Sequence, residues 1–265
     1  MLTNMLKIFT AVLRHFLSRI NLSKILSLPF LGGGSGIRGT SNLDQKQLGT
    51  VGTTGYRYPV ESYHPKEPII FFILGAPGTG KGTISTFLNS KFPNLTHLSY
   101  GDLIRYQDGI PGSWVNTLPR RKGTKKPDIP ARLAVLLIRI AIEIGKIHSG
   151  QLAWLIDGFP RDERHVVEWM AQMPQAFCVF YLSCPPEVSF ARVLGRASTS
   201  GRPDDGDESA VWERITRSIA ESKAMLVTLE KSGMKITRVD ANRDPEVVRE
   251  EILLEIKVSL QDHTY

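Results

Sequence analysis

The sequence is poor in cysteine. Its 265 residues hold two, Cys178 and Cys184. If both lie in one extended segment, six residues at about 3.3 Å each put them roughly 20 Å apart, too far for a disulfide. Two cysteines also cannot form a disulfide framework, so we expect free, buried thiols in a reducing compartment.

Long apolar runs and N-terminal acidic residues are also missing. No stretch approaches eighteen consecutive apolar residues, so we expect no membrane span. Residues 1–30 contain no Asp or Glu, and apolar residues recur there at helical spacing between Lys7, Arg14 and Arg19. A basic amphipathic helix of this kind is typical of an organellar presequence. A surface helix is the alternative, so cytoplasmic and mitochondrial locations both remain open.

The positive charge is concentrated near the N-terminus. The chain carries a net charge of +7, and residues 1–65 hold seven basic and two acidic residues, which leaves +2 for the rest. The body therefore gives no reason to expect a nucleic-acid partner. Residues 31–68 are rich in glycine and read as a flexible linker. We expect an N-terminal extension over residues 1–67 and one folded domain over residues 68–265.

A phosphate cradle follows the first strong strand signal. The apolar run 69–74 predicts a strand buried on both faces, and it leads into a glycine-rich turn and a helix. Glycines allow backbone N–H groups to converge on phosphate oxygens, Lys81 can reach the β- and γ-phosphates, and Thr83 can face Mg²⁺. The alternative is an ordinary strand-to-helix turn. The expected nucleotide-binding residues are Gly75, Pro77, Gly78, Thr79, Gly80, Lys81, Gly82 and Thr83.

The turn departs from the strict G-x-x-x-x-G-K-[ST] pattern at Gly82. Its Gly-x-Pro-Gly-x-Gly-Lys-Gly-Thr form resembles the phosphate loop of the adenylate kinase and UMP/CMP kinase family. Residues 99–105 resemble the segment that opens that family's monophosphate-binding insertion, here about 99–140. The resemblance implies that Ser99 and Arg105 bind the acceptor, with Arg105 on its phosphate. Tyr100 stands where the family has a small residue, and its ring could crowd the acceptor base.

Residues 106–130 depart further from the family, which has an amphipathic helix here. Glycine, proline and a basic run at 120–127 break any long helix. No aromatic residues interleave the basic run, so it predicts a solvated loop rather than a nucleic-acid patch. Helical periodicity resumes at Ile129, and Pro130 suits a first helical turn.

A second motif, Asp-Gly-Phe-Pro-Arg at 157–161, is specific to nucleoside monophosphate kinases. A buried strand delivers Asp157 to its carboxyl end, where it can hold the water shell of Mg²⁺. The resemblance places Gly158 and Arg161 at the acceptor. His165 stands where adenylate kinases carry Gln and UMP/CMP kinases Asn to read the acceptor base, although it could be a surface histidine. Trp169 favours the UMP/CMP kinases.

Residues 192–205 resemble the short lid of the family's cytosolic-type enzymes, here about 195–206. The resemblance implies that Arg192 stacks on the donor adenine and that Arg196 and Arg202 converge on the transferred phosphate. Arg214 follows on the next helix, and Asp204 and Asp205 would orient the lid arginines. The lid is too short for a four-cysteine zinc site. Strands are also expected at 95–99, 176–182 and 236–240, a helix at 186–194, and backbone contacts from Ala241 to the donor adenine.

The expected fold is therefore a P-loop three-layer α/β/α domain with a five-stranded parallel sheet, a monophosphate-binding insertion and a short lid. The expected reaction is ATP + NMP ⇌ ADP + NDP, with Mg²⁺ as cofactor and Lys81, Arg105, Arg161, Arg196, Arg202 and Arg214 as catalytic cations. UMP or CMP is the favoured acceptor, and AMP is the alternative. Two other classes remain: a catalytically weakened nucleotide-binding protein, and a P-loop ATPase or switch. The family is commonly monomeric, so we expect a monomer.

Overall fold

The computed structural model describes residues 67–121, 126–150, 152–198 and 205–261. The expected N-terminal helix and linker, and the lid residues Arg202 and Asp204, lie outside these ranges. No helix among the described residues is both long and apolar enough to cross a membrane. Both cysteines are free, as expected; Cys178 is buried, but Cys184 is only partly buried.

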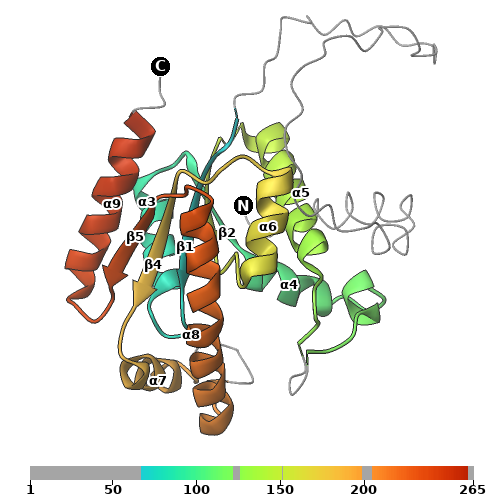
Figure 1. Ribbon diagram of the computed structural model, residues 1–265, viewed down its shortest axis with the longest axis vertical. Coiled ribbons are helices and arrows are strands. Elements are labelled where there is room, and N and C mark those ends of the chain that lie inside the picture. The colour runs from blue at the N-terminus through green and yellow to red at the C-terminus, as the bar shows by residue number, and fades with distance from the viewer. Residues whose placement is uncertain (1–66, 122–125, 151, 199–204, 262–265) are drawn as a thin grey trace, which may run out of the picture. The chain divides into compact units, whose positions relative to one another are not determined.

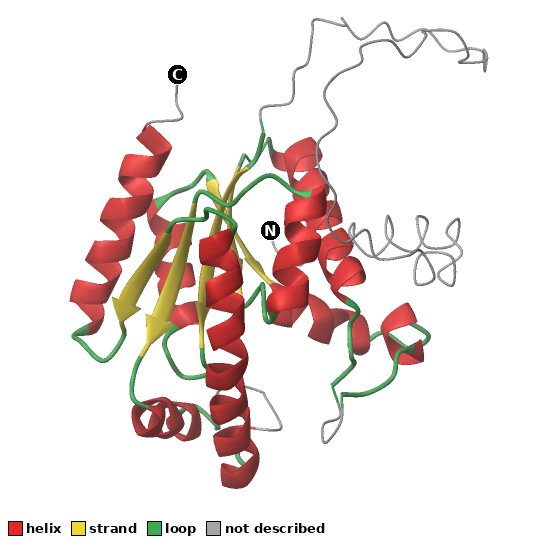
Figure 2. Ribbon diagram, viewed as in Figure 1, coloured by secondary structure: helices red, strands yellow, loops and turns green. Residues whose placement is uncertain are grey.

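Five parallel strands form the sheet, in the order β2-β3-β1-β4-β5. Helices cover both of its faces, so the expected three-layer α/β/α fold is confirmed (Figures 1 and 2). The elements are β1 (Ile69–Gly75), α3 (Lys81–Lys91), β2 (Leu95–Ser99), α4 (Tyr100–Asp108), η1 (Trp114–Thr117), α5 (Ala131–Ser149), β3 (Ala153–Asp157), α6 (Glu163–Gln172), β4 (Cys178–Ser183), α7 (Pro186–Gly195), α8 (Glu208–Lys231), β5 (Ile236–Asp240) and α9 (Pro245–Gln261).

The central strand β1 is buried on both faces, as its apolar run predicts. Phe71 and Ile73 belong to the core that also includes residues of α3 and α9. Phe72 points to the other face, where its ring meets that of Trp169 from α6 at a centroid distance of 4.9 Å. Alternate residues of one strand therefore join the two helical layers to the sheet. Figure 1 shows α3 beside α9, and α6 beside α5.

The described residues between 106 and 130 contain no long helix, as the glycines and prolines predict. Helix α4 ends at Asp108, a short 3₁₀ turn spans Trp114–Thr117, and Arg120 and Pro127 form an isolated antiparallel bridge. One detail differs from expectation. Pro130 is the N-cap of α5 rather than part of its first turn, because its ψ of 139° is extended.

Candidate functional site

The glycine-rich turn between β1 and α3 has the backbone that only glycine adopts easily. Gly78 and Gly80 have φ angles of 90° and 89°. A Cβ atom on Gly78 would lie 2.3 Å from the carbonyl oxygen of Ser189, so the loop also needs glycine for its close approach to α7. Gly80 is the N-cap of α3. The loop therefore places the N-terminus of α3 where its free N–H groups can bind an anion such as phosphate.

Lys81 is the first residue of α3, and its amine folds back over the loop. Nζ donates hydrogen bonds to the carbonyl oxygens of Gly75, at 2.7 Å, and Ala76, at 2.8 Å. The buried Thr79 hydroxyl donates to Ala76 as well, at 2.9 Å. The loop is thus closed by its own polar groups, and the lysine charge is held at its centre.

A cavity of about 440 Å³ opens beside this loop, and we call it the phosphate-loop cavity. It brings together residues predicted from four separate parts of the sequence. Its lining is Gly78, Gly80, Lys81, Gly82, Thr83, Thr86, His97, Ser99, Gly101, Asp102, Arg105, Asp157, Gly158, Arg161 and Arg196. Ser99 serves as the N-cap of α4, with its hydroxyl accepting the Asp102 N–H at 3.2 Å. The cavity lies at the carboxyl ends of β1, β2 and β3, where open α/β sheets bind ligands.

His97 is a cavity residue that the sequence analysis did not single out. Its Nε2 lies 3.5 Å from Oδ2 of Asp157, on the neighbouring strand. Asp157 ends β3, and the pairing of Ser99 with Asp157 sets β2 directly alongside. The sequence does show a polar residue, His97, inside the expected strand 95–99. Its position beside Asp157 can be inferred only when the order of the strands in the sheet is known.

The residues at this edge can accommodate a magnesium ion. Thr83 and Asp157, the two residues expected to bind the ion, both line the phosphate-loop cavity. Among the described residues there is no group of three or more His, Cys, Asp or Glu side chains that could cage a metal. Mg²⁺ usually binds one or two protein oxygens together with water and substrate phosphates, so this sparse donor set suits it.

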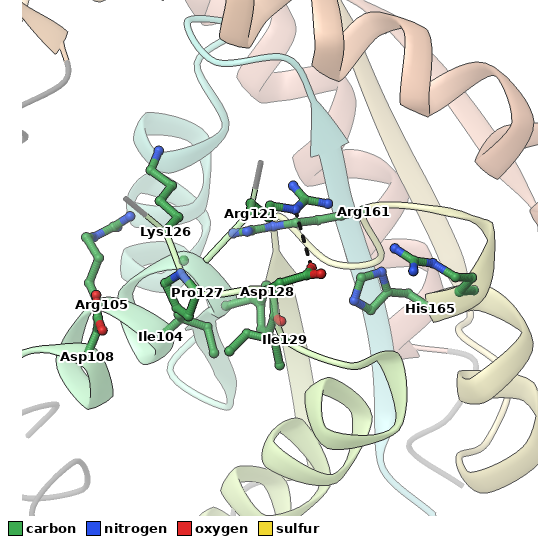
Figure 3. A pocket seen from close by; sticks show the side chains of 13 residues that line it. Ile104, Arg105, Asp108, Arg121, Lys126, Pro127, Asp128, Ile129, Arg161 and His165 are labelled. Atoms are coloured by element: carbon green, nitrogen blue, oxygen red, sulfur yellow. Dashed lines mark ion pairs between the residues drawn. The ribbon is translucent and has the colours of Figure 1, made fainter. Parts of the chain in front are cut away.

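A second cavity, of about 120 Å³, lies under the 106–130 segment, and we call it the insertion cavity. Figure 3 shows its side chains. Its lining is Tyr100, Gly101, Ile104, Arg105, Asp108, Arg121, Lys126, Pro127, Asp128, Ile129, Arg161, Arg164 and His165. Three of these residues, Gly101, Arg105 and Arg161, also line the phosphate-loop cavity. The two cavities therefore meet at one glycine and two arginines.

Both arginines lie over Gly101. A Cβ atom on this glycine would be 3.2 Å from Nη1 of Arg105 and 3.5 Å from Nη2 of Arg161. Arg105 forms an ion pair with Asp102 one turn earlier in α4. Desolvation by the surrounding protein, together with the nearby positive charges of Arg121 and Arg105, lowers the pKa of Arg161.

His165 sits in the insertion cavity, which excludes a surface location. Its side chain is 6% exposed, and Nδ1 lies 2.9 Å from Oδ1 of Asp162, the N-cap of α6. Burial acts to raise the pKa of Asp162, but hydrogen bonds from His165 and Arg164 outweigh it and hold that pKa well below its usual range. Nε2 of His165 is buried and has no hydrogen-bond partner among the described residues.

The basic run 120–127 is only partly the solvated loop that we expected. Arg120 is exposed and pairs with Asp108 at 2.8 Å. Lys126 is also exposed, although it lines the edge of the insertion cavity. Arg121 is partly buried and lines the same cavity, and its Nε lies 3.7 Å from Oδ1 of Asp128. No pattern in the sequence indicates that Arg121 is the less exposed cation, because an irregular polar segment has no periodicity.

Arg196 of the lid and Arg214 of α8 meet at one buried carboxylate. Asp205 is completely buried; Oδ2 accepts from Nε of Arg196 at 3.0 Å, and Oδ1 accepts from Nη2 of Arg214 at 2.5 Å. The predicted orienting contact from Asp205 is therefore present. Arg196 lines the phosphate-loop cavity, and Arg214 is linked to it through this carboxylate.

The two residues predicted to meet the donor base also lie together. Nη1 of Arg192 donates to the carbonyl oxygen of Ala241 at 2.9 Å. Arg192 is on α7 and Ala241 follows β5, so the contact joins segments 49 residues apart. Their proximity supports a shared role, although which ligand they contact stays a prediction.

The chain is similar in sequence to known nucleotide kinases. A family model described as an AAA domain matches residues 74–211. A UMP-CMP kinase of Gallus gallus is 32% identical over 191 residues, which cover 71% of this chain and 96% of that protein. A UMP-CMP kinase of Danio rerio is 32% identical over 69% of this chain and 93% of its own length, and a uridylate kinase of Saccharomyces cerevisiae is 29% identical over 75% and 96%. The chain belongs to the nucleoside monophosphate kinase family, whose members are ATP-dependent phosphotransferases.

Proposed function

We propose that this protein transfers the γ-phosphoryl group of ATP to a nucleoside monophosphate, with UMP or CMP as the acceptor. The observation that carries the proposal is the meeting of the two cavities at Gly101, Arg105 and Arg161. ATP would place its phosphates in the phosphate-loop cavity, and the monophosphate would enter the insertion cavity. The shared arginines then lie where the two phosphate chains approach each other.

The residues would act by position and charge. Phosphoryl transfer needs little covalent help from a protein, since the charge of the transition state is spread over equatorial oxygens. Lys81 would leave its loop carbonyls for the β- and γ-phosphates, while Arg105 would hold the acceptor phosphate. Arg161 and Arg196 line the same space and would offset the charge on the transferred group. No side chain needs to act as a general base.

Thr83, and Asp157 through water, would hold Mg²⁺, whose positive charge would offset part of the negative charge of the phosphates. Oδ2 of Asp157 lies 3.5 Å from Nε2 of His97. We also propose that closure of the lid segment, about 195–206, excludes water from the γ-phosphate.

The choice of acceptor is supported by the relatives, whose names specify UMP, CMP or uridylate. A steady-state assay with Mg-ATP and a panel of UMP, CMP and AMP tests it. We expect the highest kcat/KM with a pyrimidine monophosphate. A preference for AMP would make the protein an adenylate kinase, and nucleotide binding without transfer to any acceptor would favour a weakened nucleotide-binding protein.

We further propose that the folded domain spans residues 68–265 and that the preceding extension decides the location of the protein, cytoplasmic or mitochondrial. Imaging of a C-terminal fluorescent fusion, with and without residues 1–67, tests this. Mitochondrial signal that disappears on truncation supports a presequence, and unchanged cytoplasmic signal contradicts one.

A further inference from the structure

Tyr100 is the first residue of α4 and lies at the wall shared by α4, α6 and the 157–161 turn. The residue is 2% exposed. The ring packs edge-on against Phe159, at a centroid distance of 5.4 Å and an interplanar angle of 63°, and lies 6.3 Å from the ring of His165. Phe159 is itself fixed by the rings of Phe72 and Trp169. The orientation of the Tyr100 ring is therefore set by a buried aromatic cluster.

The guanidinium group of Arg161 lies over the face of this ring. Its Cζ atom is 4.6 Å from the ring centroid, a favourable distance for a cation–π interaction. Nε also donates to the carbonyl oxygen of Gly158, at 3.2 Å. The arginine is thus held on one side by an aromatic face and on another by a main-chain oxygen.

Other arginines around the two cavities are held differently. Arg105, Arg121, Arg164 and Arg196 each form an ion pair with a carboxylate. No described carboxylate forms an ion pair with Arg161. A carboxylate would occupy in-plane N–H donors of the guanidinium and would compete with phosphate for them. An aromatic face binds the flat side of the group and leaves those donors available.

From this contrast we propose that Tyr100 is a positioning residue for Arg161: its ring holds the guanidinium over Gly101 with no carboxylate of the described residues bonded to it, so that its Nη donors are available for phosphate. The inference rests on the proposed phosphoryl transfer and deepens it. The hydroxyl group has no part in it. Burial raises the pKa of Tyr100 to about 12, so the ring is a neutral phenol at physiological pH.

Two substitutions separate the aromatic face from simple bulk. Tyr100→Phe keeps the ring, and Tyr100→Leu keeps apolar volume but has no π-face. We expect Phe to retain near-wild-type kinetics. We expect Leu to lower kcat about three- to tenfold and to weaken binding of the monophosphate, with the KM for ATP unchanged. Equal kinetics for Leu and Phe would overturn the proposal.

A control for a general loss of cation–π packing is available at Phe87 on α3. Its ring lies 5.5 Å from Nζ of Lys91 and 5.4 Å from Cζ of Arg249, and it lines neither cavity. Phe87 is only partly buried, so Phe87→Leu should cost less thermal stability than Tyr100→Leu, and it should leave kcat unchanged. A fall in kcat for Phe87→Leu equal to that for Tyr100→Leu would show that the effect is structural and would contradict the proposal.

A double-mutant cycle tests whether Tyr100 acts through Arg161. Tyr100→Leu, Arg161→Lys and the double variant are compared by the dissociation constant of UMP or CMP, measured by calorimetry. We expect Tyr100→Leu to weaken binding when Arg161 is present and to have less effect in the Arg161→Lys background, because the flat guanidinium is gone. Fully additive effects would overturn the proposal.

Calorimetric binding also separates this inference from the proposed function. If the wild-type protein binds but phosphorylates no monophosphate, the proposed function fails, whereas weaker binding in Tyr100→Leu alone would still support the positioning role. If the wild-type protein is an active kinase and Tyr100→Leu matches it in kcat and binding, only the inference on Tyr100 fails.

Discussion

The phosphate-loop cavity and the insertion cavity share three residues but are built in different ways. The first is shaped mainly by main-chain geometry, with glycines at φ near 90° and a lysine bonded to loop carbonyls. The second is formed by side chains from α4, α6 and the irregular 106–130 segment. Two of its cations are held by different kinds of partner, a carboxylate for Arg121 and an aromatic ring for Arg161.

This difference indicates which of the two cavities tolerates amino-acid substitutions without loss of phosphate binding. Main-chain N–H groups are present whatever the side chains are, so the phosphate-loop cavity depends on a few glycines and one lysine. The insertion cavity depends on the identity of many side chains, and Tyr100, Arg121 and His165 all depart from simple expectations there. We therefore expect substitutions in the first cavity to affect every acceptor and those in the second to depend on the acceptor.

The largest expected effect breaks the phosphate-loop cavity. Lys81→Ala removes the charge at the centre of the loop and should lower kcat at least ~10²-fold with every acceptor. Lys91→Ala, at the other end of α3, is the matched control and should be close to wild type. Initial rates with Mg-ATP and saturating acceptor measure both, and near-wild-type turnover of Lys81→Ala would refute the site.

A somewhat smaller effect is expected at the junction of the two cavities. Arg105→Ala should lower kcat/KM for the monophosphate about 10- to 100-fold, the usual worth of hydrogen bonds to a charged group, with little change in the KM for ATP. Arg139→Ala, on the exposed face of α5, is the control. If the KM for ATP rises as much as that for the acceptor, Arg105 belongs to the donor site instead.

The insertion cavity is tested by a pair of neighbouring arginines. Arg121→Ala should raise the KM for the monophosphate about three- to tenfold, because a cation in the cavity attracts the anionic substrate. Arg120→Ala, which removes an exposed ion pair with Asp108, should leave the KM for the monophosphate unchanged. Equal values for the two variants would mean that the basic run acts only as a general positive surface.

The smallest expected effect is on the stability that Asp162 provides through its contacts with His165 and Arg164, which line the insertion cavity. The depressed pKa of Asp162 means that its ionised form stabilises the folded state above the unfolded value of about 3.9, and that this stability is lost as pH falls towards the folded value. Asp162→Asn keeps a helix cap and should cost about 1 kcal/mol at pH 7. Urea unfolding measures it.

That difference between Asp162→Asn and the wild-type protein should narrow as pH is lowered below about 4. Asp207→Asn, which changes the N-cap of α8 in the same way, is the comparison because the α8 cap lies on a different helix from His165 and Arg164. A constant difference at all pH values would show that the Asp162 charge is not responsible.

Much of the phosphate-loop cavity was predictable because its signals are local. Strand β1, the glycine loop and α3 are contiguous, and the strand ends at Ser99 and Asp157 are bounded by apolar runs. The contact of His97 with Asp157 depends on β2 lying next to β3, which no local pattern specifies. The inward turn of Arg121 depends on a single antiparallel bridge between Arg120 and Pro127. The positions of His97 and Arg121 thus depend on contacts between segments distant in the sequence, which local patterns do not specify.

The buried carboxylate of Asp205 has a consequence for the order of events in catalysis. It is shared between Arg196 and Arg214, so an incoming triphosphate must compete with an internal counterion before it gains either guanidinium. In such an exchange each guanidinium is paired with an anion both before and after the substrate binds. The protein can thereby keep two cations ready before the substrate arrives, without the repulsion that would otherwise push them apart.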